Sequence, residues 1–134
     1  MSNFHVIKPD GWLAPRGYAN GISATGRVIS IAGQIGWNPR SGIIESPDFA
    51  HQTAQALRNI VAVLEGADAR PEHLVRMTWF ITDRRAYINA RAAIGDAYRE
   101  IIGRNFPAMS VIVVSGLIEA EAVVEIEATA VVPE

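Results

Sequence analysis

The order of apolar patterns along the chain predicts an α+β fold, a sheet with two helices packed on one face. Residues 49–64 and 87–102 keep the apolar spacing of amphipathic helices. Other segments alternate apolar and polar residues or are apolar throughout, as strands are. The order is two strands, a helix, a strand, a helix and two strands, without an internal repeat, and such segregated elements are typical of an α+β sheet.

In the first half of the chain, strands are expected at residues 19–24 and 27–32. Thr25-Gly26 separates them, and a two-residue connection of this kind predicts a β-hairpin. Ser46-Pro47 predicts the start of the first helix, because serine is a good N-cap and proline suits the first helical position. Gly66 fits the end of that helix.

In the second half, residues 75–82 alternate as a strand does, and Asp83 is placed to cap the second helix. Further strands are expected at residues 109–114 and 123–132. In the last strand, one face reads Val124, Ile126, Ala128, Ala130, so Glu125 and Glu127 both point away from the core. A glutamate held in a cleft is suited to proton transfer.

The composition favours one globular domain, residues 1–134, with apolar surface to spare for self-association. The length of 134 residues suits a single core, and 49% of the residues are apolar. No apolar run approaches the ~20 residues that span a bilayer. No signal peptide is visible at the N-terminus, so a cytoplasmic location without membrane contact is expected.

The charged and reactive residues exclude several classes of function. The chain has no cysteine, which excludes disulfides and thiol chemistry, and its only lysine, Lys8, lies near the N-terminus, where a Schiff base is not expected. The histidines His5, His51 and His73 show no metal-ligand spacing, so no metal site is expected. Twelve basic residues are scattered against fourteen acidic ones, which disfavours nucleic-acid binding.

Four short motifs resemble the RidA/YjgF family, also called the endoribonuclease L-PSP family. They are Gly33-Gln34, Asn59-Ile60, Phe106-Pro107-Ala108 and the stretch from Val124 to Ala128. Their order and spacing match that family from roughly Pro15 to Val132. The resemblance implies a chorismate-mutase-like fold with a mixed sheet. It also implies a homotrimer that binds small molecules at its subunit interfaces, without a cofactor.

The resemblance also implies roles for individual residues. Glu125 matches the family's water-activating glutamate, and Glu127 has no such role. Tyr18 matches a tyrosine at the entrance to the site, and Gly33 matches a position where the main chain approaches the ligand. Ala32 stands where many relatives have serine. Trp37 follows closely enough to line the same pocket.

Met109 departs from the family pattern, because the imine and enamine deaminases carry an arginine directly after Pro-Ala. That arginine can hold a substrate carboxylate through its planar fork, which methionine cannot do. Three explanations stay open: the ligand lacks a carboxylate, another cation replaces the arginine, or catalysis is lost. Arg16, two residues before Tyr18, is the candidate for the second.

The sequence therefore favours a RidA-like trimer that binds an imine, enamine or carbonyl metabolite and acts as a hydrolytic deaminase of altered substrate range. The alternative is a non-catalytic ligand-binding or protein-interaction trimer. A ribonuclease is disfavoured by the acidic charge balance and by the absence of an RNA-binding motif.

Overall fold

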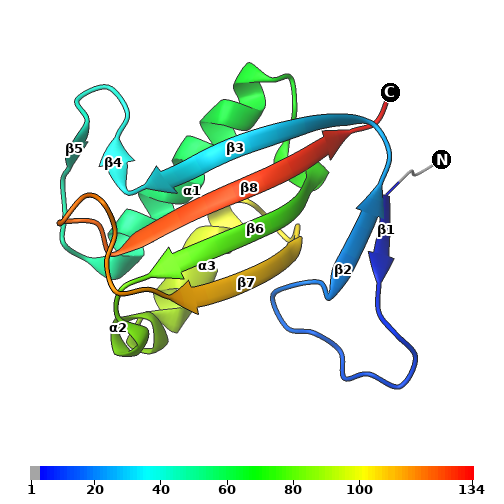
Figure 1. The fold of residues 1–134 in the computed structure, drawn as a ribbon, viewed down its shortest axis with the longest axis horizontal. Coiled ribbons are helices and arrows are strands. Elements are labelled where there is room, and N and C mark those ends of the chain that lie inside the picture. Colours follow the sequence, from blue (N-terminus) through cyan, green and yellow to red (C-terminus); the bar gives the residue numbers. More distant parts are fainter. Residues whose placement is uncertain (1–3) are drawn as a thin grey trace.

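The computed structural model describes residues 4–134, and its main feature is a four-stranded mixed sheet (Figure 1). The strand order is β3 (Arg27–Ile35), β8 (Val124–Val132), β6 (Leu74–Ile81) and β7 (Ala108–Val113). β8 pairs antiparallel with both of its neighbours, whereas β6 and β7 run parallel. The expected mixed sheet is confirmed, with strand bounds within a residue or two of the prediction for β6, β7 and β8.

The described residues form three α-helices where two were expected, and the two longer ones cover one face of this sheet (Figure 1). They are α1 (Phe49–Gly66), α2 (Arg84–Asn89) and α3 (Arg91–Ile101), and a short 3₁₀ turn, η1 (Pro71–His73), precedes β6. The predicted second helix is divided at Ala90, whose backbone angles (φ −95°, ψ 3°) lie outside the α-helical range. Ala90 ends α2 through its bond to the carbonyl of Ala86.

Aspartates cap the first two helices. Asp83 accepts the amide of Ala86 at 3.0 Å, as predicted. The first helix begins two residues later than expected, because Asp48 rather than Ser46 is its N-cap and accepts the amide of His51 at 2.9 Å. The Ser46 hydroxyl instead accepts the amide of Asp48.

The hairpin predicted at Thr25-Gly26 was wrong. β2 (Gly21–Ala24) pairs with β1 (Phe4–Ile7) in a separate two-stranded sheet, and β3 pairs with β8. Gly26 takes φ 152°, which side chains disfavour, and packs so closely that a Cβ there would lie 2.1 Å from the carbonyl oxygen of Val132. The chain at Gly26 therefore passes from the sheet that contains β2 to the main sheet that contains β3, and it does not form a hairpin turn. A third small sheet pairs β4 (Trp37–Asn38) with β5 (Ile43–Ile44).

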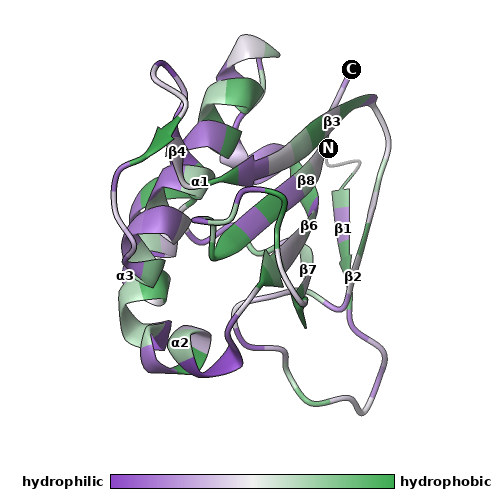
Figure 2. Ribbon diagram, turned by 60° about the vertical axis from the view of Figure 1, so that its left-hand side comes forward, coloured by the Kyte–Doolittle hydropathy of each residue, from purple (hydrophilic) through white to green (hydrophobic). Residues whose placement is uncertain are grey.

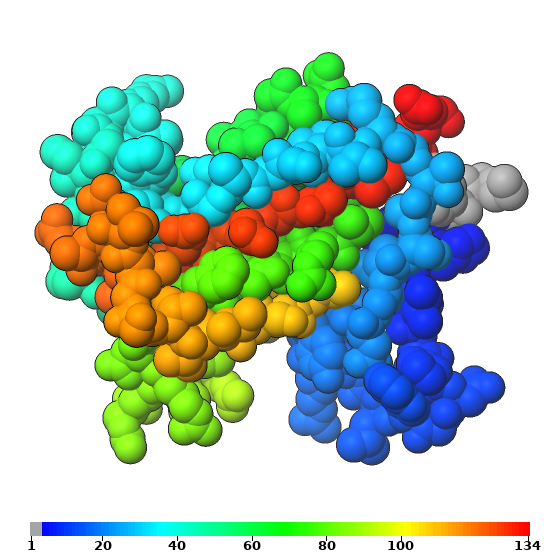
Figure 3. All heavy atoms as spheres, in the orientation of Figure 1, coloured from blue at the N-terminus to red at the C-terminus, as the bar shows by residue number. Residues whose placement is uncertain are grey.

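The core lies between the main sheet and helices α1 and α3. The predicted inward residues of β8 are confirmed, since Val124, Ile126, Ala128 and Ala130 are at most 5% exposed. Hydrophobic and hydrophilic residues alternate along this strand (Figure 2). The opposite face of the sheet is uncovered within one copy (Figure 3), so Glu125 and Glu127 do point away from the core.

Two buried amide side chains tie α1 to the ends of β3 and β8. Gln52 donates to the carbonyls of Ser46 and Glu121 and accepts the amide of Val123. Asn59 donates to the carbonyls of Ile35 and Trp37. Because buried polar groups are costly unless paired, these bonds fix the position of the segments that carry Gly33 and Glu125.

Candidate functional site

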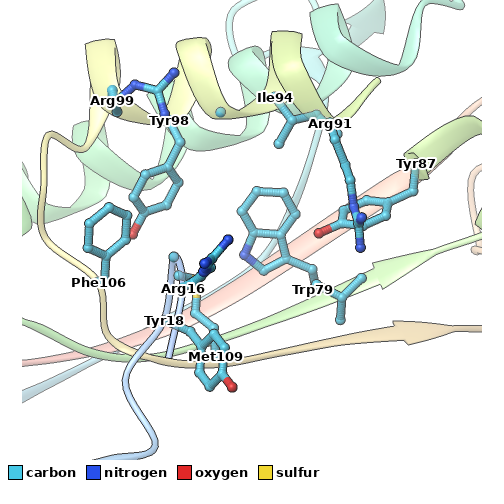
Figure 4. A pocket seen from close by; sticks show the side chains of 13 residues that line it. Arg16, Tyr18, Trp79, Tyr87, Arg91, Ile94, Tyr98, Arg99, Phe106 and Met109 are labelled. Carbon is cyan, nitrogen blue, oxygen red and sulfur yellow. The ribbon is translucent and has the colours of Figure 1, made fainter. Parts of the chain in front are cut away.

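A cavity of about 470 Å³ opens on the helix-covered side of the sheet, beside the edge strand β7 (Figure 4). Its volume is in the range of small-molecule sites in proteins. Its walls come from β6, β7, α2, α3 and the segment before β2. The lining residues are Arg16, Gly17, Tyr18, Trp79, Tyr87, Arg91, Ile94, Gly95, Tyr98, Arg99, Phe106, Met109 and Val111.

Main-chain pairing places Arg16 and Tyr18 beside Met109. The amide of Ala19 donates to the carbonyl of Pro107 at 3.0 Å, and Ala19 forms a parallel bridge with Ala108. Met109 lies next to the buried Met77 in the parallel pairing of β6 and β7, so its side chain faces the helices. Three of the residues singled out from the sequence thus line one cavity.

Aromatic rings form the back wall of the cavity. Tyr98 stacks on Phe106, with ring centroids 5.6 Å apart, and its hydroxyl donates to the carbonyl of Asn105. Burial raises the pKa of Tyr98 above its usual value, so the phenol stays neutral and keeps that bond. Trp79 is 4% exposed, and its Nε1 has no hydrogen-bond partner among the residues that the structure describes. A buried donor without a partner is rare and costly.

Arginines give the cavity a positive charge. Arg99 is neutralised by Asp96, at 2.7 Å. Arg16 and Arg91 form no ion pair within residues 4–134, and the Arg91 guanidinium lies 5.9 Å from the ring centroid of Tyr87. The lining contains no aspartate or glutamate. The cavity therefore suits an anionic ligand.

Glu125 lies on the other face of the sheet from Met109. Glu125 is paired with Phe80 across β8 and β6, whereas Met109 is level with Met77. Side chains alternate between the two faces along a strand, so Met77 and Phe80 of β6 point to opposite faces. Because paired residues on neighbouring strands share a face, the side chains of Met109 and Glu125 also point to opposite faces. Within one copy, a ligand in the cavity does not reach the Glu125 carboxylate.

Gly33 accompanies Glu125 on that second face. Ala32 and Gly33 together stand opposite Glu127, between the pairs formed by Ile31 and Gln34, which is a β-bulge. A Cβ on Gly33 would lie 2.2 Å from Oε2 of Glu125. The absence of a side chain at Gly33 thus leaves room for the carboxylate, and both Ala32 and Gly33 are exposed beside it.

The two remaining residues lie apart from these groups. Trp37 is on β4, is 38% exposed and does not line the cavity. Its carbonyl accepts a hydrogen bond from the side-chain amide of Asn59. Glu127 lines a separate hollow of about 230 Å³ with Arg76 and Thr78. Among residues 4–134, no cluster of three histidine or acidic side chains is placed to hold a metal ion, and no helix is long and apolar enough to cross a membrane.

Sequence reasoning missed much of the cavity wall. Trp79, Tyr98 and Phe106 have the spacing of ordinary core residues, and none of them was among the predicted site residues. Arg91 belongs to a set of scattered arginines and carries no motif. The signal that separates these residues from the core is the unpaired indole nitrogen of Trp79, which only coordinates can show.

The fold and the cavity define a small α+β protein with a pocket of the size that small-molecule sites have. Residues 12–132 match the family model for endoribonuclease L-PSP. A RutC family protein of Pyrococcus horikoshii is 35% identical over 113 residues, which cover 84% of this chain and 85% of the relative. The chain therefore belongs to the endoribonuclease L-PSP family, which is the RidA/YjgF family.

Two further relatives bear on function and fold. The human 2-iminobutanoate/2-iminopropanoate deaminase is 33% identical over 105 residues, which cover 78% of this chain and 73% of the relative. The crystal structure of the Rid family protein YyfB of Yersinia pestis, whose function is unknown, superposes with a TM-score of 0.84 at 32% identity. That match covers 97% of this chain and 99% of YyfB.

Proposed function

We propose that this protein is a homotrimeric hydrolase of 2-imino acids, with each site completed by two copies of the chain. One observation supports this above the others: the cationic cavity and the Glu125–Gly33 pair lie on opposite faces of the same sheet. A cyclic trimer is built from head-to-tail interfaces, which bring different faces of neighbouring copies together. The cavity of one copy then holds the ligand while Glu125 of the next copy reaches its imine carbon.

The proposed reaction needs only water and one carboxylate. Glu125 holds a water molecule, takes one of its protons as the oxygen attacks the imine carbon, and passes that proton to the imine nitrogen, giving a carbinolamine. Glu125 then takes the proton of the carbinolamine hydroxyl as the carbonyl forms and the carbon–nitrogen bond breaks, and it passes this second proton to the leaving nitrogen. The products are a 2-oxo acid and ammonia.

The other predicted site residues lie either beside Glu125 or at the cavity of the neighbouring copy in this proposal. Gly33 leaves room for the Glu125 carboxylate itself, which lies where a side chain at position 33 would otherwise stand. Ala32 lies next to it in the same bulge, and Tyr18 walls the entrance to the cavity. Trp37 lies outside the cavity of one copy, so it would contact the ligand only across an interface.

The cavity favours one of the three explanations for Met109. Arg16 and Arg91 supply guanidinium groups to the cavity that Met109 also lines, so the loss of the family arginine does not leave the cavity without a cation. A substrate carboxylate can therefore still be bound. The deaminase name of the human relative is consistent with such a substrate.

The test is the hydrolysis of 2-imino acids generated in the assay by an amino-acid oxidase. The wild-type protein should accelerate the release of ammonia, and Glu125→Gln should lower kcat by about 10²–10⁴-fold, the usual contribution of a positioned base. Glu127→Gln is the matched control, because it removes the second carboxylate of the same strand and should change the rate less than about threefold.

Two outcomes would contradict the proposal. Equal losses in both variants would show that Glu125 has no special role. A wild-type rate no higher than that of buffer, with the trimer intact, would favour the non-catalytic ligand-binding alternative.

A further inference from the structure

We infer that the cavity selects 2-imino acids with an aromatic side chain, and that Arg16, Arg91 and the indole N–H of Trp79 hold the anionic end of such a ligand. This inference rests on the proposed function for the reaction but extends it to the substrate class. The three residues come from different parts of the fold: the segment before β2, the start of α3 and the middle of β6.

The anion would be held by donors that the protein leaves unused. The Arg16 guanidinium and the Trp79 ring nitrogen are directed toward the same part of the cavity (Figure 4). Trp79 is more than nine-tenths buried, and Nε1 finds no partner among the described residues. A carboxylate in the cavity would accept this N–H and pair with guanidinium groups that lack an acidic partner.

The remaining walls suit an aromatic ring. Tyr98 and Phe106 are stacked on each other, and Tyr98 lies 6.4 Å from Trp79 between ring centroids. Ile94, which is 7% exposed, adds an aliphatic side. Aromatic rings pack favourably in stacked or edge-to-face arrangements with such neighbours.

The size of the cavity points the same way. An apolar cavity of about 150 Å³ is enough to bind benzene. The volume here is about 470 Å³, so a ring and a three-carbon acid fit together. A three- or four-carbon imino acid alone would leave most of the aromatic wall in contact with water.

The inference can be tested without catalysis by measuring the binding of stable 2-oxo acids with titration calorimetry. Phenylpyruvate carries both the ring and the carboxylate, pyruvate lacks the ring, and phenylacetone lacks the carboxylate. Phenylpyruvate should bind with a Kd lower than either by about tenfold or more, given the burial of a phenyl group and the loss of a charged contact.

The affinity of single variants for phenylpyruvate tests whether the named residues bind it. Arg16→Gln and Arg91→Gln should each weaken phenylpyruvate binding by about tenfold or more. Trp79→Phe keeps a ring and removes the N–H, and should weaken binding by about threefold to tenfold. Arg85→Gln, which removes an exposed arginine of α2 outside the cavity, should have no effect beyond about twofold.

The outcomes are decisive whether or not the protein is an enzyme. Pyruvate binding as tightly as phenylpyruvate would overturn the aromatic preference. Equal affinities in the Arg16, Arg91 and Arg85 variants would overturn the anion site, even if Trp79→Phe failed to fold. Phenylpyruvate that does not bind at millimolar concentration would overturn the whole inference, while hydrolysis of small imino acids would still support the proposed function.

Discussion

The backbone of Gly33 lies against the carboxylate of Glu125, so close that a Cβ at position 33 would stand 2.2 Å from Oε2 and 2.9 Å from Cγ. Gly33 does not need a positive φ, so its role is to leave space rather than to permit a turn. The geometry of the β-bulge on β3 thereby decides where the proposed base on β8 can lie.

Gly33→Ala should displace the Glu125 side chain and leave the fold intact. The clashing atoms belong to a side chain that can rotate, so the melting temperature should change little, whereas hydrolysis should fall about as far as in Glu125→Gln. Gly116→Ala is the control, because a Cβ there meets nothing within 4 Å. The double variant Gly33→Ala/Glu125→Gln should be no slower than Glu125→Gln, since both changes disable one group. Full activity in Gly33→Ala would show that the observed carboxylate position is not the working one.

The protein should be a trimer at micromolar concentration. The sheet face that carries Glu125 is uncovered in one copy, and it exposes large apolar side chains such as Val28 and Ile112, at 63% and 44%. Static light scattering coupled to size exclusion should give three times the mass of the chain. A stable monomer would remove the basis for a site shared between copies.

Met109→Arg should not raise activity on aromatic 2-imino acids. The new guanidinium would join Arg16 and Arg91 in a cavity whose lining holds no carboxylate, so repulsion offsets any added contact. We expect kcat/KM to change less than about threefold or to fall. Met109→Leu, a volume-conserving change, is the control. A gain of about tenfold or more for carboxylate substrates alone would mean that Arg16 and Arg91 do not hold the substrate, because a charged hydrogen bond is worth that much.

The sequence predicted the layers of the fold because alternation and helical spacing are local properties. β6, β7 and β8 and the cap at Asp83 follow from such patterns. The hairpin at Thr25-Gly26 failed because two-residue turns and extended glycines look alike in sequence, and the packing of Gly26 against Val132 decides between them. The split of the second helix at Ala90 likewise has no residue signature.

For the site, the family motifs identified positions but not their arrangement. The resemblance implied a site at a subunit interface for both Met109 and Glu125, and only the strand register shows that the two side chains leave opposite faces of a protomer. Within residues 4–134, Arg91 forms no ion pair and Nε1 of Trp79 has no hydrogen-bond partner. These two observations make Arg91 and Trp79 candidates for ligand binding. A missing partner leaves no trace in a sequence.

The central claim, a site completed by two copies, is tested most directly by mixing two defective chains. Glu125→Gln keeps the cavity and lacks the base, and Met109→Trp keeps the base and fills the cavity; each alone should be inactive. The two chains are coexpressed with different tags, and trimers that carry both are isolated by sequential affinity steps. In a cyclic trimer each mixed assembly has one interface with both halves intact, so the account predicts about a third of the wild-type rate. Mixed trimers as inactive as either parent would contradict it.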